Sequence, residues 1–151
     1  GVEVCKTSGL NVQVGSIDQK LPFNDNTFDY AICNVTIQMV MYPEVLMSEM
    51  KRIAKYQIVS FPNFAFYKNR FDLFFKGRMP INGLFGYHWF DTGHIHQLSI
   101  KDFKTLVNRV GGLEILEKKS IKSGNPVKDF LIKIFPNLFE QIPVFLLRKT
   151  Q

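Results

Sequence analysis

The chain is 151 residues long, with 46% hydrophobic and 21% charged residues and a formal net charge of +6. This length suits one domain with a sizeable core, and no apolar run approaches the roughly 20 residues that a membrane-spanning helix needs. Two cysteines are too few for a disulfide framework, so a reducing, cytoplasmic compartment is expected. Because the positive charge is moderate, solvated helix faces explain it better than a nucleic-acid partner does.

The first nine residues, GVEVCKTSG, have the pattern of a helix whose end is marked by Gly9. A chain that opens inside a helix is expected to be a fragment of a longer protein. The next segment, LNVQV at 10–14, alternates apolar and polar positions and contains two valines, so it predicts a short strand.

The following segments have the lengths of a strand–helix–strand unit. Residues 30–35 and 56–61 are mostly apolar, which is typical of strands buried on both faces of a parallel sheet. Between them, residues 43–54 have helical spacing of apolar side chains, and Pro43 suits the first turn. This βαβ pattern predicts a parallel sheet flanked by helices.

A helix that mixes aromatic and basic side chains is predicted over residues 64–78. Two interpretations are open for it. Its apolar side chains pack on the core, or they bind an anionic surface or a partner protein. We favour packing, because a helix of this composition needs to bury only one face; the side chains concerned are Phe66, Phe71, Phe74 and Phe75.

The last third of the chain predicts a capped helix and two more strands. Ser99 begins the helix and is followed three positions later by an acid, as in a capping box. Residues 113–121 and 142–150 predict the strands, and a helical insertion at 127–139, broken at a proline, separates them. With no repeat or linker in the sequence, we expect a single α/β domain over residues 1–151.

Several motifs in one order resemble a known family. The stretch GSIDQKLPFNDNTFDYAICNVTIQMV resembles the middle of a class I S-adenosylmethionine-dependent methyltransferase. Downstream, SFPNFAFYKNRFDLFFKGRMP and YHWFDTGHIHQLSIKDF resemble the methionine biosynthesis protein MetW family in particular. The resemblance covers nearly the whole chain and is weakest between residues 121 and 140.

The resemblance implies an α/β, Rossmann-like class I methyltransferase fold with strand order 3-2-1-4-5-7-6 and an antiparallel last strand. It implies an N-terminal truncation as well, because strands 1 and 2, the glycine-rich loop and the ribose-binding acid have no counterpart here. Alone, this fragment is expected to be inactive. The expected strands 3, 4, 5, 6 and 7 are residues 10–14, 30–35, 56–61, 113–121 and 142–150.

In the family, the turn after strand 3 lies beside the adenine of S-adenosylmethionine. That turn corresponds here to Gly15, Ser16, Ile17 and Asp18, with Ser16 in the place of the usual acid. A serine hydroxyl can still form a hydrogen bond to an amino group, although without charge assistance. The alternative is that this segment is a turn and nothing more.

The end of strand 4 corresponds to the methionine end of the cofactor. By the resemblance, Asn34, Val35 and Gln38 line it, because ligands of open α/β sheets bind beyond the carboxyl ends of the strands. On the sequence alone, the pattern favours a surface position for Gln38.

Four residues are candidates for the wall of an acceptor pocket: Asn63, Trp89, His94 and His96. Asn63 follows strand 5 and could instead satisfy the turn beside Pro62. No catalytic residue is identifiable, since methyl transfer to a nucleophilic acceptor depends largely on positioning.

The histidines also raise the question of a metal site. His94 and His96 share one face of an extended segment and, with Asp91 or His88, could form a three-ligand centre. There is no HExxH pattern and no cysteine pair, so we expect no metal.

Two functions follow from the resemblance, and a third, weaker one follows from the positive charge. The first, which we favour, is a cytoplasmic enzyme of methionine biosynthesis that moves a methyl group from S-adenosylmethionine to a small acceptor. The second is a non-catalytic partner that supports homoserine O-acyltransferase. The third, a nucleic-acid methyltransferase, ranks last because FPNF is not the NPP-type motif of the amino-methylating enzymes.

Overall fold

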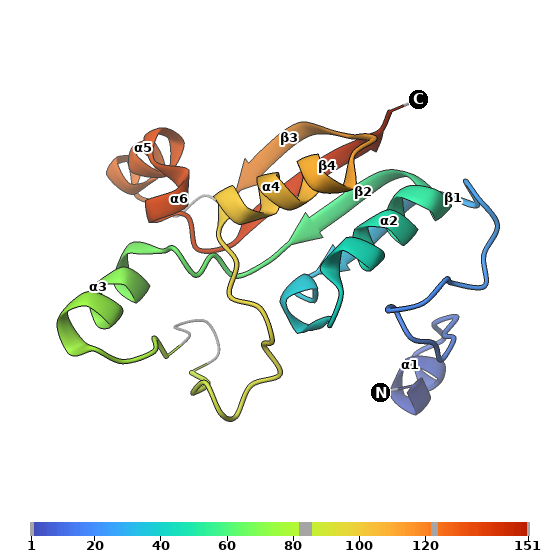
Figure 1. Ribbon diagram of the computed structural model, residues 1–151, viewed down its shortest axis with the longest axis horizontal. Helices are drawn as coiled ribbons and strands as arrows, with labels where there is room; N and C mark the ends of the chain where they lie inside the picture. The colour runs from blue at the N-terminus through green and yellow to red at the C-terminus, as the bar shows by residue number, and fades with distance from the viewer. Residues whose placement is uncertain (1, 82–85, 122–123, 151) are drawn as a thin grey trace.

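A four-stranded mixed sheet forms the centre of the computed structural model, which describes residues 2–81, 86–121 and 124–150 (Figure 1). The strand order is β1-β2-β4-β3. β1 and β2 are parallel, whereas β4 is antiparallel to both of its neighbours. The strands are β1 (Phe28–Asn34), β2 (Ala54–Ser60), β3 (Leu113–Ser120) and β4 (Pro143–Lys149).

This order confirms the expected 4-5-7-6 half of the class I methyltransferase fold, including its antiparallel last strand. The strand predicted at residues 10–14 is wrong, because this segment has no ladder partner and its Leu10 and Val14 side chains are exposed. Alternation marks a half-buried strand only where a neighbouring strand supplies hydrogen bonds. Within the described residues, β1 pairs only with β2, so its outer edge is open. The truncation itself stays a prediction.

Two helices cover one face of the sheet, α2 (Pro43–Ile53) and α4 (Ile100–Val110) (Figure 1). The rings of Phe61, Phe103 and Phe145 are fully buried at the centre of the core. The predicted capping box of α4 is confirmed, because the Ser99 hydroxyl accepts from the Asp102 N–H at 3.2 Å and the Asp102 carboxylate accepts from the Ser99 N–H.

The predicted first helix is confirmed as α1 (Val2–Thr7). Gly9 has a φ of 73°, and the N–H of Leu10 donates to the carbonyl of Cys5 at 3.0 Å. This is the Schellman arrangement, which favours glycine because other residues rarely adopt the left-handed conformation.

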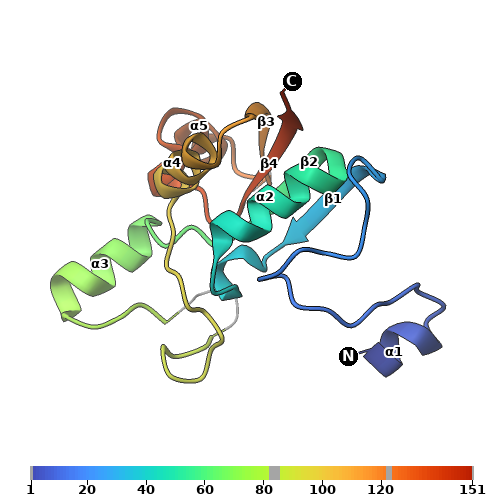
Figure 2. The same cartoon turned by 45° about the vertical axis from the view of Figure 1, so that its right-hand side comes forward.

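The helix α3 (Tyr67–Lys76) points away from the sheet in two views (Figures 1 and 2). Its aromatic side chains were expected to pack on the core, and for three of the four this is wrong. Phe71, Phe74 and Phe75 are 52%, 82% and 67% exposed, whereas Phe66 is buried at the start of the helix. The reason is that none of the described elements forms a second layer over α3, so its aromatic rings contact one another instead; the Phe71 and Phe75 centroids are 4.5 Å apart.

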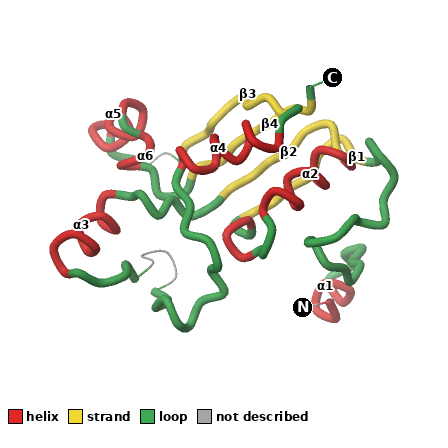
Figure 3. Tube along the Cα trace, in the orientation of Figure 1, coloured by secondary structure: helices red, strands yellow, loops and turns green. Residues whose placement is uncertain are grey.

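The insertion between the last two strands forms two short helices, α5 (Pro126–Ile134) and α6 (Pro136–Phe139) (Figure 3). The predicted break at Pro136 is confirmed, since the ring cannot donate the backbone hydrogen bond that a continuous helix needs. In the residues that the structure describes, no helix is both long and apolar enough to cross a membrane.

Candidate functional site

The carboxyl ends of β1 and β2 meet in a hydrogen-bonded polar cluster. Asn34 and Ser60 are register partners, and the Ser60 hydroxyl donates to the Asn34 side-chain oxygen at 2.6 Å. The Val35 N–H donates to both the carbonyl and the hydroxyl oxygen of Ser60, at 3.0 and 3.1 Å. Ser60 was missed by the sequence analysis, although a polar residue at the end of an apolar strand was the available signal.

Val35 is in the left-handed region, with a φ of 49°. A β-branched residue pays a steric penalty there of about 1 to 2 kcal/mol, and such outliers cluster at functional sites. The hydrogen bond that the Val35 N–H donates to the Ser60 hydroxyl, and the one that the Val35 carbonyl accepts from Gln38, hold the backbone in this conformation.

Gln38 lies in a short 3₁₀ helix (Ile37–Met39) and is fully buried, so the surface interpretation is wrong. Its side-chain amide donates to the Val35 carbonyl at 2.9 Å and lies 3.5 Å from Nε2 of His94. Its backbone carbonyl accepts from the N–H groups of Ile95 and His96 at 2.9 and 3.0 Å. Gln38 therefore ties the extended segment 94–96 to the end of β1. Its Oε1 atom is buried and has no hydrogen-bond partner among the described residues.

The expected shared face of His94 and His96 is confirmed, because both are half-buried while Ile95 between them is exposed. The His94 ring packs edge-on against Phe64, with centroids 5.8 Å apart, and burial lowers the pKa of His94. His96 Nε2 lies 3.3 Å from the carbonyl oxygen of Met41. The segment thus places a neutral His94 beside Gln38.

Two other acceptor candidates have different surroundings. Asn63 is buried and its side chain bonds only backbone: it donates to the carbonyls of Asn137 and Glu140 and accepts from the N–H of Ala65. This favours the structural interpretation of Asn63. Trp89 is 69% exposed, and its place in an acceptor pocket stays a prediction.

The turn predicted to lie beside adenine forms at residues 16–18. The Ser16 hydroxyl accepts from the Asp18 N–H, and the Asp18 carboxylate accepts from the Tyr42 N–H, both at 3.4 Å. Ile17 is half-buried and lines an apolar cavity of about 340 Å³ with β1 and α2. At Gly15, a side chain would meet no atom within 4 Å, so the backbone there is open to approach.

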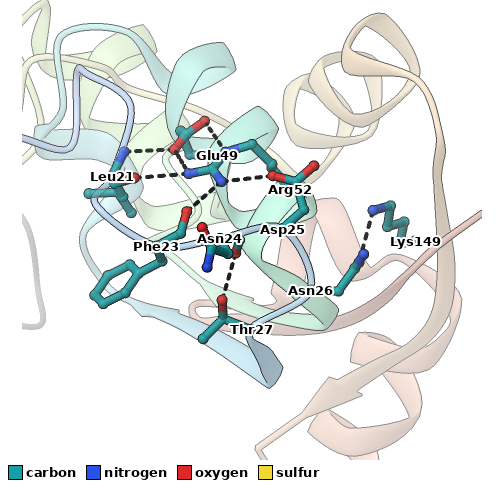
Figure 4. A network of polar contacts seen from close by, with 9 residues as sticks. All are labelled: Leu21, Phe23, Asn24, Asp25, Asn26, Thr27, Glu49, Arg52 and Lys149. Atoms are coloured by element: carbon teal, nitrogen blue, oxygen red, sulfur yellow. Dashed lines mark hydrogen bonds and ion pairs between the residues drawn. The ribbon is translucent and has the colours of Figure 1, made fainter.

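A clamp formed by Arg52 fixes the segment that follows this turn (Figure 4). Its guanidinium donates to the backbone carbonyls of Leu21 and Phe23 at 3.0 and 2.7 Å, and to the carboxylates of Asp25 and Glu49. The hydrogen bonds to the carboxylates of Glu49 and Asp25 raise the pKa of Arg52, and the bond from Arg52 lowers the pKa of Glu49. Segment 21–25 is thereby held against α2.

Of the side chains in residues 2–81, 86–121 and 124–150, no three His, Cys, Asp or Glu groups gather in a way that could hold a metal ion. The geometry therefore offers a polar cluster at the ends of β1 and β2, an apolar cavity beside Ile17, and a buried amide that positions His94.

Comparison with solved structures identifies the fold. A methyltransferase of Thermotoga maritima, described as a possible histamine N-methyltransferase, has a TM-score of 0.61 at 20% identity over 99% of this chain and 69% of its own. One from Mesorhizobium loti has a TM-score of 0.63 at 12% identity over 98% and 75%. The [4+2]-cyclase SpnF has a TM-score of 0.59 at 14% identity over 99% and 60%. The shared feature at these identities is the class I methyltransferase fold.

Comparison of sequences identifies the family. A bifunctional methionine biosynthesis protein MetXA/MetW of Rhodopirellula baltica is 34% identical over 119 residues, in an alignment that covers 73% of this chain and 19% of the relative. The chain thus spans about a fifth of that relative's length. The profile of the methionine biosynthesis protein MetW family matches residues 1–147. This match confirms the family expected from the motifs, and the chain belongs to the methionine biosynthesis protein MetW family.

Proposed function

We propose that this chain binds S-adenosylmethionine and belongs to an enzyme that transfers its methyl group to a small acceptor. The observation that carries the proposal is the cluster of Asn34, Ser60 and the left-handed Val35 at the carboxyl ends of β1 and β2. Ligands of open α/β sheets bind at this edge. When bound, S-adenosylmethionine supplies an electrophilic methyl group.

The residues present fit parts of that cofactor. Ile17 and the apolar cavity beside it suit the faces of an adenine ring, and the hydroxyl of Ser16 is exposed at the same turn. At the other end, Asn34 is exposed and Val35 is fixed by its hydrogen bonds to Ser60. An uncharged His94 avoids the electrostatic repulsion that a protonated ring would exert on the positive sulfonium.

Calorimetric titration of the full-length protein with S-adenosylmethionine tests this proposal. We expect saturable binding to one site, and we expect Asn34→Ala to weaken it about tenfold, because one hydrogen-bonding group and its link to Ser60 are lost. Asn108→Ala, at an exposed position of α4, is the matched control. No heat at near-millimolar ligand from a folded protein would contradict the proposal.

A second candidate function is that of a partner protein for homoserine O-acyltransferase. It is favoured by the relative in which MetXA and MetW form one bifunctional polypeptide. The aromatic face of α3, formed by Phe71, Phe74 and Phe75, supports it, because exposed aromatic rings beside basic residues are typical of binding surfaces.

Co-purification with the acyltransferase tests the partner function. We expect Phe71→Ala combined with Phe74→Ala to weaken the complex at least about tenfold, since aromatic anchors dominate such interfaces. Phe130→Ala, at an exposed position of α5, is the matched control. Equal recovery of the acyltransferase with the α3 variant and with the unmodified chain would exclude this surface.

A further inference from the structure

A separate cavity of about 260 Å³ lies beyond the end of β2, between α3 and α5. Its lining includes Phe64, Tyr67, Lys68, Asn69, Lys128 and Gln141. The volume is just below the usual range for ligand pockets, so the cavity suits a molecule of few non-hydrogen atoms.

The charge of this cavity is positive. Lys68 and Lys128 come from different helices, and within the described residues neither side chain forms a hydrogen bond or an ion pair. The acidic residue of the lining is Asp72, and its carboxylate is already paired with Lys76. The lining therefore contains two lysine side chains whose charge is not neutralised by an ion pair among the described residues.

The polar groups around the lysines suit a small carboxylate. At α5 the N–H groups are occupied, because Asn125 caps those of Val127 and Lys128, whereas the N–H groups at the start of α3 have no side-chain cap and can donate to a carboxylate oxygen. The remaining donors are side chains, the Tyr67 hydroxyl and the Gln141 amide, which suit a group with two oxygens.

The cavity is adjacent to the cluster at the end of β1. Phe64 lines the cavity and also packs edge-on against His94, which lies 3.5 Å from Gln38. A molecule held by the two lysines would therefore lie beside Phe64, at the same edge of the sheet as Asn34 and Val35.

We propose that the cavity between α3 and α5 binds a small carboxylate through Lys68 and Lys128, and that this carboxylate belongs to the methyl acceptor. The second half of this inference rests on the proposed methyltransferase function. The first half rests on the cavity and its charge alone.

Nuclear magnetic resonance titration of the ¹⁵N-labelled protein with sodium succinate tests the site, with succinamide as the uncharged probe at matched ionic strength. We expect saturable shifts of amides at residues 63–69, 128 and 141 with succinate and none with succinamide. Lys68→Met combined with Lys128→Met keeps the aliphatic stems and should weaken binding about tenfold, because both charged donors are removed. Lys101→Met with Lys104→Met, on the exposed side of α4, changes the net charge equally and should bind as the unmodified chain does.

Unchanged succinate affinity in the Lys68 and Lys128 variant would overturn the site, and so would equal perturbation at surface lysines elsewhere. Tighter binding of inorganic phosphate than of succinate would overturn the carboxylate assignment. Tyr67→Phe removes only a hydroxyl and gives an independent reading of the same contact, with weaker succinate binding expected. Because S-adenosylmethionine is absent from the titration, this result is independent of whether the cofactor binds or a methyl group is transferred.

Discussion

The polar side chains at the end of β1 act mainly on one another. Gln38 donates to the carbonyl of the strained Val35 and, by its own carbonyl, anchors the segment that carries His94. The side-chain nitrogen of Gln38 donates to the Val35 carbonyl and also lies beside His94. Because an amide nitrogen can only donate, Nε2 of the neutral His94 ring is the acceptor in this contact. Gln38 is thus a positioning residue, and its contact with His94 requires the imidazole ring to be uncharged.

The pH dependence of stability should show this state of His94. Burial lowers its pKa in the folded protein, whereas an unfolded chain takes up the proton near its ordinary pKa of about 6.5. Because the unfolded state binds more protons, the free energy of unfolding should fall as the pH drops through and below about 6.5. His94→Gln should lose this step in denaturant titrations across that range. The same step in the variant would assign the proton to another group.

At the scale of elements, Arg52 connects α2 with the segment that follows the candidate adenine turn. It bonds two backbone carbonyls and two carboxylates, and its side chain is 17% exposed. No local pattern in the sequence indicates this clamp, because the partners lie about 30 positions apart. The clamp explains how an irregular segment keeps a fixed place beside the helix.

Arg52→Met should lower the free energy of unfolding, because charge-assisted hydrogen bonds are lost and the half-buried Glu49 is left without its cation. The lowered pKa of Glu49 contributes stability above its ordinary pKa, and this contribution is lost as the pH falls through the folded value. The variant should therefore show a flatter acid limb in denaturant titrations. Arg109→Met, at an exposed position of α4, should change the free energy of unfolding by less than about 0.5 kcal/mol, both at neutral pH and along the acid limb. Equal losses in the two variants would contradict a specific clamp.

The elements that sequence reasoning predicted correctly carry their signals locally. Gly9 ends a helix because of its own φ, and Ser99 begins one because of its own hydroxyl. The predictions of a strand at 10–14 and of a packed α3 were wrong because each depends on a neighbouring element, a second strand or a second layer. A short stretch of sequence carries no information about such a neighbour. For the same reason the candidate site was predicted in outline, with Gln38 and His94 named, while Ser60 and Phe64 emerged only from the contacts.

At the scale of the whole molecule, the sheet is covered unevenly. β2 is buried along most of its length, whereas β1 exposes Phe28, Tyr30 and Ile32 and has no strand partner on its outer edge within the described residues. An open edge with apolar side chains is a template for pairing with a further chain. The net charge of +6 opposes this pairing only weakly at physiological ionic strength, because charges farther apart than about 8 Å are screened.

The 151-residue chain should therefore associate as its concentration rises, with β1 in the contact. Ile32 is 68% exposed, and Ile32→Lys places a charge on that strand while removing an apolar side chain whose burial is worth about 1.5 to 3 kcal/mol. We expect the association constant from sedimentation equilibrium to fall at least about tenfold. Ile121→Lys is the matched control, since Ile121 is 65% exposed, lies beyond the end of β3 and gives the same change in net charge. If both variants associate equally, general charge repulsion rather than the edge of β1 governs the contact. If the unmodified chain stays monomeric, the prediction is wrong, and the open edge is protected by its own twist or by its immediate surroundings.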